Sequence, residues 1–391
     1  MSGDGKTRCT ICLCMIVKNE SNIIRNCLDS VLNTIDYWVI CDTGSTDGTQ
    51  DIIKEYFKEK GVKGELHEHK WENFGKNRSL AFYEARGKCD YVYVIDADDR
   101  LNGDILIYDN TYTHVNVKID YSGLKFRRQQ VFNNTYNWVY VGVLHEHPEL
   151  KSSNVKINVL NLEGCHVNAG TFGNRSQDPE KYAKDAITLE DALKYEPNNS
   201  RYMYYLAQSY RDSKQYDKAV EKYKLRTKMG GNPEEVYYSY YMVGKLKMHL
   251  NKDFDTEILH DYLDAFNYRP SRLETLYEIM MYYRSLKKFK LAFGYGILGL
   301  DTDKTTDNMM VINDIYEWMY LDELGSCAIC CGLSDIGVRC LNTLLNSPKY
   351  KVPDSQRGRI EANVKAVQNT KEKDPHEDCN EGVTNNHTHE Q

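Results

Sequence analysis

Hydrophobic residues follow two different patterns along the chain. Between residues 10 and 175, short apolar runs that suit strands alternate with stretches whose apolar positions recur at helical spacing. From residue 178 onward the helical spacing is continuous. Alternating strands and helices are typical of an α/β domain, whereas continuous helical spacing indicates an all-α domain. The pattern therefore predicts two domains of different class.

Three apolar runs in the first part predict parallel strands, at Thr10–Val17, Tyr37–Cys41 and Tyr91–Ile95. Helical spacing predicts helices over roughly 21–33, 49–60 and 76–86. Connections of this length favour parallel pairing with right-handed crossovers. Because ligands of such open sheets bind beyond the carboxyl ends of the strands, the polar clusters that follow the three strands are candidate binding residues. These clusters are Lys18–Glu20, Asp42–Asp47 and Asp96–Asp99.

The second part contains a repeat. Large and small apolar residues recur at the packing positions of a tetratricopeptide repeat, whose period is about 34 residues. In one repeat that starts at Ser200 these residues are Leu206, Ala207, Tyr210, Ala219 and Tyr223, and in another that starts at Leu273 they are Ile279, Tyr283 and Ala292. Since one helix pair cannot bury its apolar face alone, the repeats are expected to stack. The predicted segments are a flexible N-terminus (1–9), an α/β domain (10–177), helical repeats (178–368) and a disordered tail (369–391).

Composition narrows the class of protein. A net charge of −7 argues against a general nucleic-acid binder. No segment approaches the ~20 apolar residues of a membrane-spanning helix, and no export signal is apparent, so we expect a cytoplasmic protein. The 12 cysteines are then expected to be reduced thiols rather than zinc ligands or disulfides.

An Asp-x-Asp sequence, Asp96-Ala97-Asp98, stands at the end of the most apolar predicted strand. Transfer from a nucleoside diphosphate sugar requires a divalent cation to neutralise the departing diphosphate, and hard cations prefer carboxylate oxygens. Of two carboxylates at a strand end, one can face the ribose while the other binds the metal. Acidic strand ends are also common without a metal, so this motif indicates a metal site only when neighbouring motifs support it.

Three motifs in order resemble glycosyltransferase family 2. They are Met15–Glu20, Val39–Thr49 and Tyr91–Asp99, and the resemblance covers roughly residues 10–175. It implies an α/β A-type glycosyltransferase fold, a nucleotide-binding sandwich, and inversion at the anomeric carbon. With the helical part, the chain resembles bacterial and viral family 2 enzymes that carry tetratricopeptide tails.

The resemblance also implies roles for single residues. Asp42 is expected to contact the nucleobase, and Asn19 and Glu20 to line the same pocket. Asn77 and Arg78 resemble the family's arginine–asparagine segment near the nucleotide, in reversed order. Asp98 is expected to bind the metal with Asp96 nearby.

Two later residues complete the predicted site. An inverting transfer needs a base that deprotonates the acceptor on the face opposite the diphosphate, and Glu146 matches the family's acidic residue at this point. An ordinary solvated glutamate at a strand end is the alternative for Glu146. A-type enzymes often add a late histidine to the metal site, and His166 is placed for this, although a single histidine is more often structural.

The predicted function is transfer of a sugar from a nucleoside diphosphate sugar, most often UDP-linked in the family, with Mn²⁺ or Mg²⁺. The acceptor is expected to be a glycan or a protein, and the repeats to bind it or to form a homodimer. One alternative is a non-catalytic scaffold with a degenerate nucleotide-binding domain, which intact Asp96, Asp98 and Glu146 argue against. Another is a nucleotidyltransferase, which should have a Gly-rich, basic phosphate loop after the first strand where this chain has Lys18–Glu20.

Overall fold

The computed structural model describes residues 7–373, and the chain divides into two compact units, residues 1–213 and 214–391. The predicted domain boundary after residue 177 lies within the first unit, because α4 (Lys181–Tyr195) and α5 (Ser200–Asp212) belong to it. The predicted flexible N-terminus and disordered tail lie mostly outside the described residues. Helix α13 (Asp354–Lys373) extends five residues into the predicted tail.

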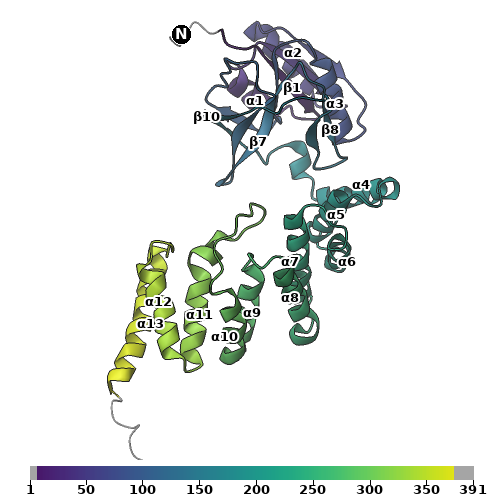
Figure 1. Ribbon diagram of the computed structural model, residues 1–391. Helices are drawn as coiled ribbons and strands as arrows, with labels where there is room; N and C mark the ends of the chain where they lie inside the picture. The colour runs from purple at the N-terminus through teal and green to yellow at the C-terminus, as the bar shows by residue number, and fades with distance from the viewer. Residues whose placement is uncertain (1–6, 374–391) are drawn as a thin grey trace, which may run out of the picture. The chain divides into compact units, whose positions relative to one another are not determined.

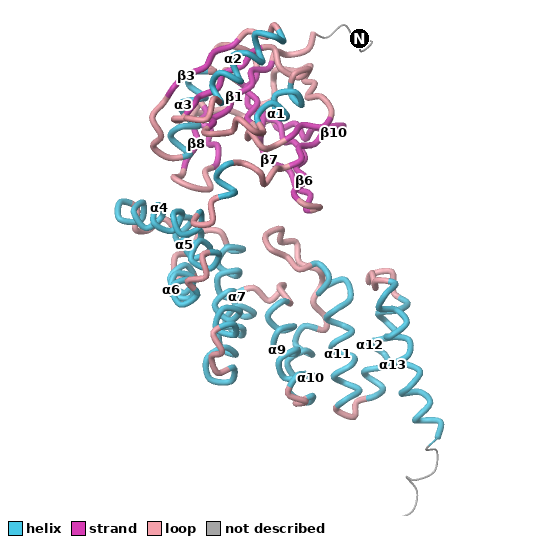
Figure 2. Tube along the Cα trace, turned by 180° about the vertical axis from the view of Figure 1, so that it is seen from behind, coloured by secondary structure: helices cyan, strands magenta, loops and turns pink. Residues whose placement is uncertain are grey.

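The first unit contains an eight-stranded mixed sheet with the order β3-β2-β1-β4-β7-β6-β10-β5, and a separate hairpin of β8 and β9 (Figures 1 and 2). Strands β2, β1 and β4 are parallel, as predicted, and β3 joins them in the same direction, whereas β7 runs antiparallel to both β4 and β6. The strands are β1 (Ile11–Val17), β2 (Tyr37–Asp42), β3 (Gly64–Glu68), β4 (Tyr91–Val94), β5 (Arg100–Asn102), β6 (His114–Tyr121), β7 (Leu124–Asn133), β8 (Trp138–Val141), β9 (His147–Leu150) and β10 (Val159–Asn168). The helices before α4 are α1 (Ile24–Val31), α2 (Thr49–Lys60) and α3 (Phe74–Glu84).

Alternation along β1 builds a core on each face of the sheet. Ile11, Leu13, Met15 and Val17 pack with side chains of α1 and α2, such as Leu28 and Phe57. Cys12 and Cys14 point to the other face, where Ala81 and Phe82 of α3 lie. Because successive strand residues point to opposite faces, one apolar strand fills both layers of an α/β/α sandwich. Cys12 and Cys14 are small core residues. All cysteines in the described part whose state the structure gives are free thiols, as predicted.

The predicted parallel elements are confirmed, with shifts of up to three residues at their ends. Helix α2 has the predicted bounds. Helix α1 begins three residues later and ends two residues earlier than predicted, and α3 begins and ends two residues earlier. The strand β3 was not predicted, because its sequence, Gly-Glu-Leu-His-Glu, contains a single aliphatic residue. It is one of the two edge strands of the sheet, where half-exposed polar side chains are tolerated.

The second unit consists of helices in succession (Figure 1). The predicted packing residues are buried: Ala219, Tyr223, Ile279 and Ala292 are 0% exposed. In the first unit, Leu206, Ala207 and Tyr210 of α5 are equally buried. The helices are α6 (Tyr216–Arg226), α7 (Pro233–His249), α8 (Leu259–Tyr268), α9 (Glu274–Ser285), α10 (Phe289–Gly296), α11 (Tyr320–Cys330), α12 (Ser334–Asn346) and α13.

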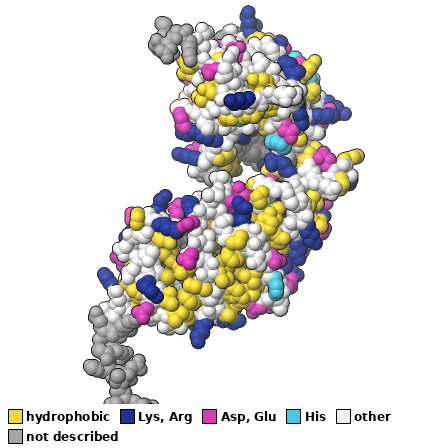
Figure 3. Space-filling model, in the orientation of Figure 1, with side chains coloured by type: hydrophobic (Ala, Val, Ile, Leu, Met, Phe, Trp, Pro, Cys, Tyr) yellow, Lys and Arg dark blue, Asp and Glu magenta, His cyan; other side chains and the backbone are white. Residues whose placement is uncertain are grey.

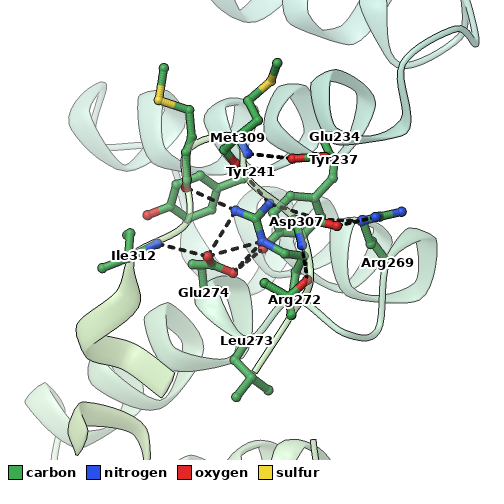
Figure 4. A network of polar contacts seen from close by, with 12 residues as sticks. Glu234, Tyr237, Tyr241, Arg269, Arg272, Leu273, Glu274, Asp307, Met309 and Ile312 are labelled. Atoms are coloured by element: carbon green, nitrogen blue, oxygen red, sulfur yellow. Dashed lines mark hydrogen bonds and ion pairs between the residues drawn. The ribbon is translucent and has the colours of Figure 1, made fainter. Parts of the chain in front are cut away.

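A buried polar network holds the loop before α11 against α9 (Figure 4). Arg272, 1% exposed, donates hydrogen bonds to Glu274 at 3.0 Å and to Asp307 at 3.2 Å. Its guanidinium also donates to the carbonyl oxygens of Met309 and Met310. A buried charge requires such partners, because desolvation otherwise outweighs the gain from burial. The network therefore fixes a loop that has few apolar residues of its own.

The surface of the second unit carries many hydrophobic side chains on the face seen in Figure 3. Within residues 7–373, no helix is both long and apolar enough to cross a bilayer. Among the large hydrophobic residues that are exposed in this unit are Met281, Leu286, Leu291, Ile297, Leu298 and Leu300.

Candidate active site

The carboxyl ends of β2, β1 and β4 lie side by side at one edge of the sheet. Val17 at the end of β1 pairs with Asp42 at the end of β2, and β1 pairs with β4 in the same direction. The three polar clusters predicted from the sequence follow these ends. Glu20, Asp96 and Asp98 line one cavity of about 710 Å³, a size typical of small-molecule sites.

Asp42 organises the turn between β2 and α2. Its Oδ1 accepts hydrogen bonds from the backbone N–H groups of Gly44 and Ser45, at 2.9 and 2.8 Å, and from Gln50 Nε2 at 2.9 Å. The other oxygen, Oδ2, is buried and has no hydrogen-bond partner in the described part of the chain. A buried carboxylate oxygen without a partner is costly, so this atom is suited to accept a hydrogen bond from a ligand.

Asn19 and Glu20 attach the loop after β1 to the same turn. Asn19, at a positive φ of 57°, accepts from the backbone N–H of Thr46 at 2.8 Å through Oδ1. The backbone N–H of Glu20 donates to Thr49 Oγ1 at 2.8 Å. The loop is thereby fixed so that the Glu20 side chain lines the cavity.

Arg78 connects the acidic strand end with the predicted base. From α3 it donates through Nη2 to Asp96 Oδ1 at 2.5 Å and through Nε to Glu146 Oε1 at 2.7 Å. Burial lowers the pKa of Arg78, but the carboxylates of Asp96 and Glu146 outweigh this and raise it well above its usual value. Burial raises the pKa of Asp96, and the charges of Arg78 and Arg128 bring it below its usual value. These residues form a charged bridge across the site.

This bridge separates two cavities. The larger one lies towards Glu20, Thr43 and Asp98, and a second cavity of about 500 Å³ lies towards β7. Both are lined by Arg78, Asp96 and Glu146. A small molecule in one cavity and a second one in the other would therefore meet at Glu146.

Carboxylates are crowded in the larger cavity. Burial, with the nearby charges of Asp98, Asp47 and Asp96, raises the pKa of Glu20 to about 7, although a hydrogen bond from Asn174 lowers it. Asp99 lines a neighbouring cavity, and burial with the charges of Asp96 and Asp98 raises its pKa to about 6. Negative charge that the protein does not neutralise makes the cavity suited to a cation.

The segment after β10 approaches the acidic residues from outside. The backbone N–H of Gly173 donates to Asp98 Oδ2 at 3.0 Å, and that of Asn174 to Glu20 Oε2 at 3.3 Å. A Cβ atom on Gly170 would lie 2.0 Å from the carbonyl oxygen of Asp98, so only glycine fits. Arg175 lines the cavity and stacks on the ring of Phe74 at 4.6 Å.

Helix α5 holds the loop that presents Glu146. The ring of Tyr205 stacks on His145, with centroids 3.8 Å apart and an angle of 10° between the rings. Arg201 donates to the carbonyl oxygen of His145 at 2.9 Å, and the backbone N–H of Val143 donates to the Tyr202 hydroxyl at 3.2 Å. The first helix of the predicted repeat therefore supports the site.

Four predicted site residues line neither cavity: Asn19 and Asp42, which hold the turn described above, and Asn77 and His166. Asn77 is 1% exposed and uses its side-chain amide on backbone groups of Glu72 and Lys70, at 2.9 and 3.1 Å, so it shapes a loop instead of lining either cavity. His166, the predicted third metal ligand, is exposed and lines neither cavity. The reason is the alternation of β10: Cys165 and Val167 face the core, so His166 faces the other way.

Residues of β7 also line the site, although no sequence motif predicts them. Gln130 is 1% exposed, lines the second cavity, and has no hydrogen-bond partner for either amide atom within residues 7–373. Arg128 lines the same cavity and donates to Asp99 at 3.2 Å. The register of an antiparallel strand from a distant part of the sequence brings them here, and no local motif marks it.

Comparison with known proteins shows what the α/β part resembles. Residues 12–137 match the model of the family described as glycosyl transferase family 2. The SPbeta prophage-derived glycosyltransferase SunS of Bacillus subtilis is 26% identical over 212 residues, which are 50% of this chain and 48% of that protein. The match thus spans about half the length of this curated relative. A TPR repeat-containing protein of Synechococcus elongatus is 36% identical over 97 residues, covering 25% of this chain and 22% of that protein.

Solved structures give more distant likenesses. The crystal structure of S. aureus TarS is 14% identical, with a TM-score of 0.35, over 64% of this chain and 55% of that one. The C-terminal part of a TPR repeat-containing protein from Cytophaga hutchinsonii is 18% identical, with a TM-score of 0.36, over 50% of this chain and 70% of that one.

Proposed function

Because the chain carries a glycosyltransferase family 2 domain followed by tetratricopeptide-like helices, we propose that it is an inverting glycosyltransferase. It would move a sugar from a nucleoside diphosphate, most simply UDP, to a hydroxyl-bearing glycan or protein acceptor. One observation carries the proposal. Arg78 bridges Asp96 at the end of β4 and Glu146, at the wall shared by two cavities.

The nucleotide would occupy the edge formed by β1 and β2. The free Oδ2 of Asp42 is suited to an N–H of the base, and the loop of Asn19 and Glu20 lies beside it. The diphosphate would then lie at Asp98 and Arg175, both of which line the larger cavity. Arginine is a strong partner for phosphate oxygens.

The carboxylates of the larger cavity fit a divalent cation. Asp98, with Asp96 nearby, would hold Mn²⁺ or Mg²⁺, and uncompensated negative charge around Glu20 supports this assignment. Mg²⁺ in such sites is commonly bound by one or two carboxylates together with substrate phosphates, so a complete protein cage is not required. The cation would neutralise the charge that develops on the departing diphosphate.

Glu146 would act as the base. The acceptor oxygen attacks the anomeric carbon as the bond from that carbon to the diphosphate oxygen breaks, and Glu146 takes the hydroxyl proton. Arg78 keeps the Glu146 carboxylate in place. The amide of Gln130 provides both a donor and an acceptor for sugar hydroxyls in the second cavity. Homodimerisation through the repeats stays a prediction.

The test is release of nucleoside diphosphate from a panel of nucleotide sugars. Glu146→Gln should bind donor like the native protein and lose transfer, because the amide cannot accept the proton. Arg78→Met should weaken both donor binding and transfer. Arg86→Met is the control and should change neither, since Arg86 is exposed and donates a hydrogen bond to Asn137. Turnover retained in Glu146→Gln would remove this residue from the role of base, and failure of every donor would reject the proposed function.

A further inference from the structure

A second group of side chains suited to a metal lies away from both cavities. His67, at the end of β3, and His69, just after it, are two residues apart and therefore project from the same side of the chain. Glu84, the last residue of α3, faces them. Within the described residues, these three form the one group of His, Cys, Asp or Glu whose possible ligand atoms all lie within 4.8 Å of one another.

The distances in this group suit one small cation. Glu84 Oε1 lies 3.4 Å from His69 Nε2, and Glu84 Oε2 lies 3.7 Å from His67 Nδ1. In a tetrahedral site with bonds of about 2.0–2.1 Å, neighbouring ligand atoms are about 3.3 Å apart. The two imidazole rings are parallel within 2°, with centroids 6.1 Å apart. Since the ligand atoms all lie within 4.8 Å of one another, the side chains would have to close by at most about 1.5 Å to hold one cation.

His67 has the second partner that is usual for a metal-binding histidine. Its Nε2 lies 3.0 Å from Glu65 Oε2, and the Glu65 carboxylate is itself fixed by Tyr37, whose hydroxyl donates to Oε1 at 2.7 Å, and by Lys88. A proton on Nε2 leaves the lone pair of Nδ1 free, and Nδ1 faces Glu84. A carboxylate that holds the far nitrogen of the ring orients the histidine for a metal.

His69 presents a buried ring nitrogen to Glu84. Its Nε2 is buried and makes no hydrogen bond in the part of the chain that the structure describes. A buried polar atom of this kind is uncommon, and a metal would satisfy it. Because this nitrogen lies 3.4 Å from Glu84 Oε1, its unmet hydrogen-bonding capacity belongs to the same three-residue group.

We propose that His67, His69 and Glu84 bind one divalent transition-metal ion, most suitably Zn²⁺, with water as the fourth ligand. Two imidazole nitrogens and one carboxylate are ligands that Zn²⁺ prefers and that Mg²⁺ does not. None of the three lines either cavity, so the role is structural. The ion would clamp the edge strand β3 to the end of α3.

The proposed metal site is also connected to the edge of the sheet where the nucleotide would bind. The backbone N–H of His69 donates to the carbonyl oxygen of Asp42 at 2.9 Å. An ion that fixes His69 would therefore fix the backbone at Asp42. The metal site itself does not depend on the proposed transferase activity.

The test uses the full chain after removal of metal with a chelator. Titration with Co²⁺ should show one equivalent bound in a tetrahedral site with nitrogen ligands, detected by its visible absorption, and Zn²⁺ should displace it. Zn²⁺ at about 100 times its dissociation constant should raise the melting temperature by about 5 °C. His69→Gln and Glu84→Gln should lose both signals.

Three controls make the result decisive. His260→Gln alters an exposed histidine of α8 and should keep the signals. Asp98→Ala should also keep them, which separates this site from the carboxylates of the larger cavity. Far-UV circular dichroism must show that the variants are folded. The same Co²⁺ spectrum in native protein and folded His69→Gln, or no tetrahedral Co²⁺ in the native protein, would overturn the proposal.

Discussion

The ring of Tyr205 lies flat on the ring of His145, 3.8 Å away. His145 has a positive φ of 51°, a conformation that a non-glycine residue adopts only when its surroundings hold it. The next residue is Glu146. A helix with repeat-type packing therefore helps to determine where the proposed base lies.

Tyr205→Ala should lower kcat by about two- to tenfold and leave donor binding unchanged. The reason is the loss of a stacking interaction worth ~0.5–1.5 kcal/mol, which orders the loop of Glu146. Tyr205→Phe keeps the ring and is the matched control. Equal kcat values for the two variants would show that the stack does not position Glu146.

Cation binding in the larger cavity should release a proton. The pKa of Glu20 is raised to about 7, so close to half of the molecules carry this proton at neutral pH. A cation favours the ionised form, and apparent affinity for Mn²⁺ with UDP should therefore rise as the pH rises through 7. Titration calorimetry in buffers of different ionisation enthalpy measures the released proton.

Glu20→Gln is the matched variant for this experiment, because the amide has the same shape and does not titrate. Its binding enthalpy should be nearly independent of the buffer. If native protein and Glu20→Gln release the same number of protons, another group accounts for the pH dependence.

Gly170→Ala should impair metal-dependent nucleotide binding. The added Cβ would lie 2.0 Å from the carbonyl oxygen of Asp98, so the acidic loop must move. Gly294→Ala is the control: Gly294 is in helix α10, and a Cβ there meets no atom within 4 Å. Comparison of dissociation constants for UDP with Mn²⁺ measures the effect. Equal affinity in both variants would show that the position of Asp98 does not matter.

The buried network of the second unit should dominate the stability of that unit. Arg272→Met leaves Glu274, 1% exposed, without its main partner and should lower the free energy of unfolding by about 3–5 kcal/mol. Lys349→Met, which removes a pair with the exposed Asp303, should have little effect. Urea denaturation followed by circular dichroism measures both, and similar midpoints for the two variants would contradict this account.

The same network predicts loss of stability in acid. Hydrogen bonds from Arg269, with those from Arg272, hold the pKa of Asp307 below its usual value although burial raises it. The stabilisation is complete above the unfolded pKa, about 3.9, and is lost as the pH falls through the lower folded pKa. Urea midpoints between pH 6 and pH 2 should therefore fall less in Asp307→Asn than in the native chain.

The sequence predicted the part of the site that depends on local order. Strand ends followed by Asp42 and Asp96 are recognisable in one dimension, and parallel pairing then places them at one edge. His166 was predicted to bind the metal because of its position in the chain. Cys165 and Val167 of β10 face the core, however, so His166 faces away from the site. Gln130 reaches the site only through the register of β7 against β4, which no local pattern encodes.

The most direct test of the central claim is calorimetric titration of nucleoside diphosphates, with and without Mn²⁺, into the native chain and Asp98→Ala. We expect one nucleotide, most simply UDP, to bind with an affinity that Mn²⁺ increases, and Asp98→Ala to lose that increase. No binding of any nucleotide under either condition, or the same effect of Mn²⁺ in Asp98→Ala, would contradict the proposed site.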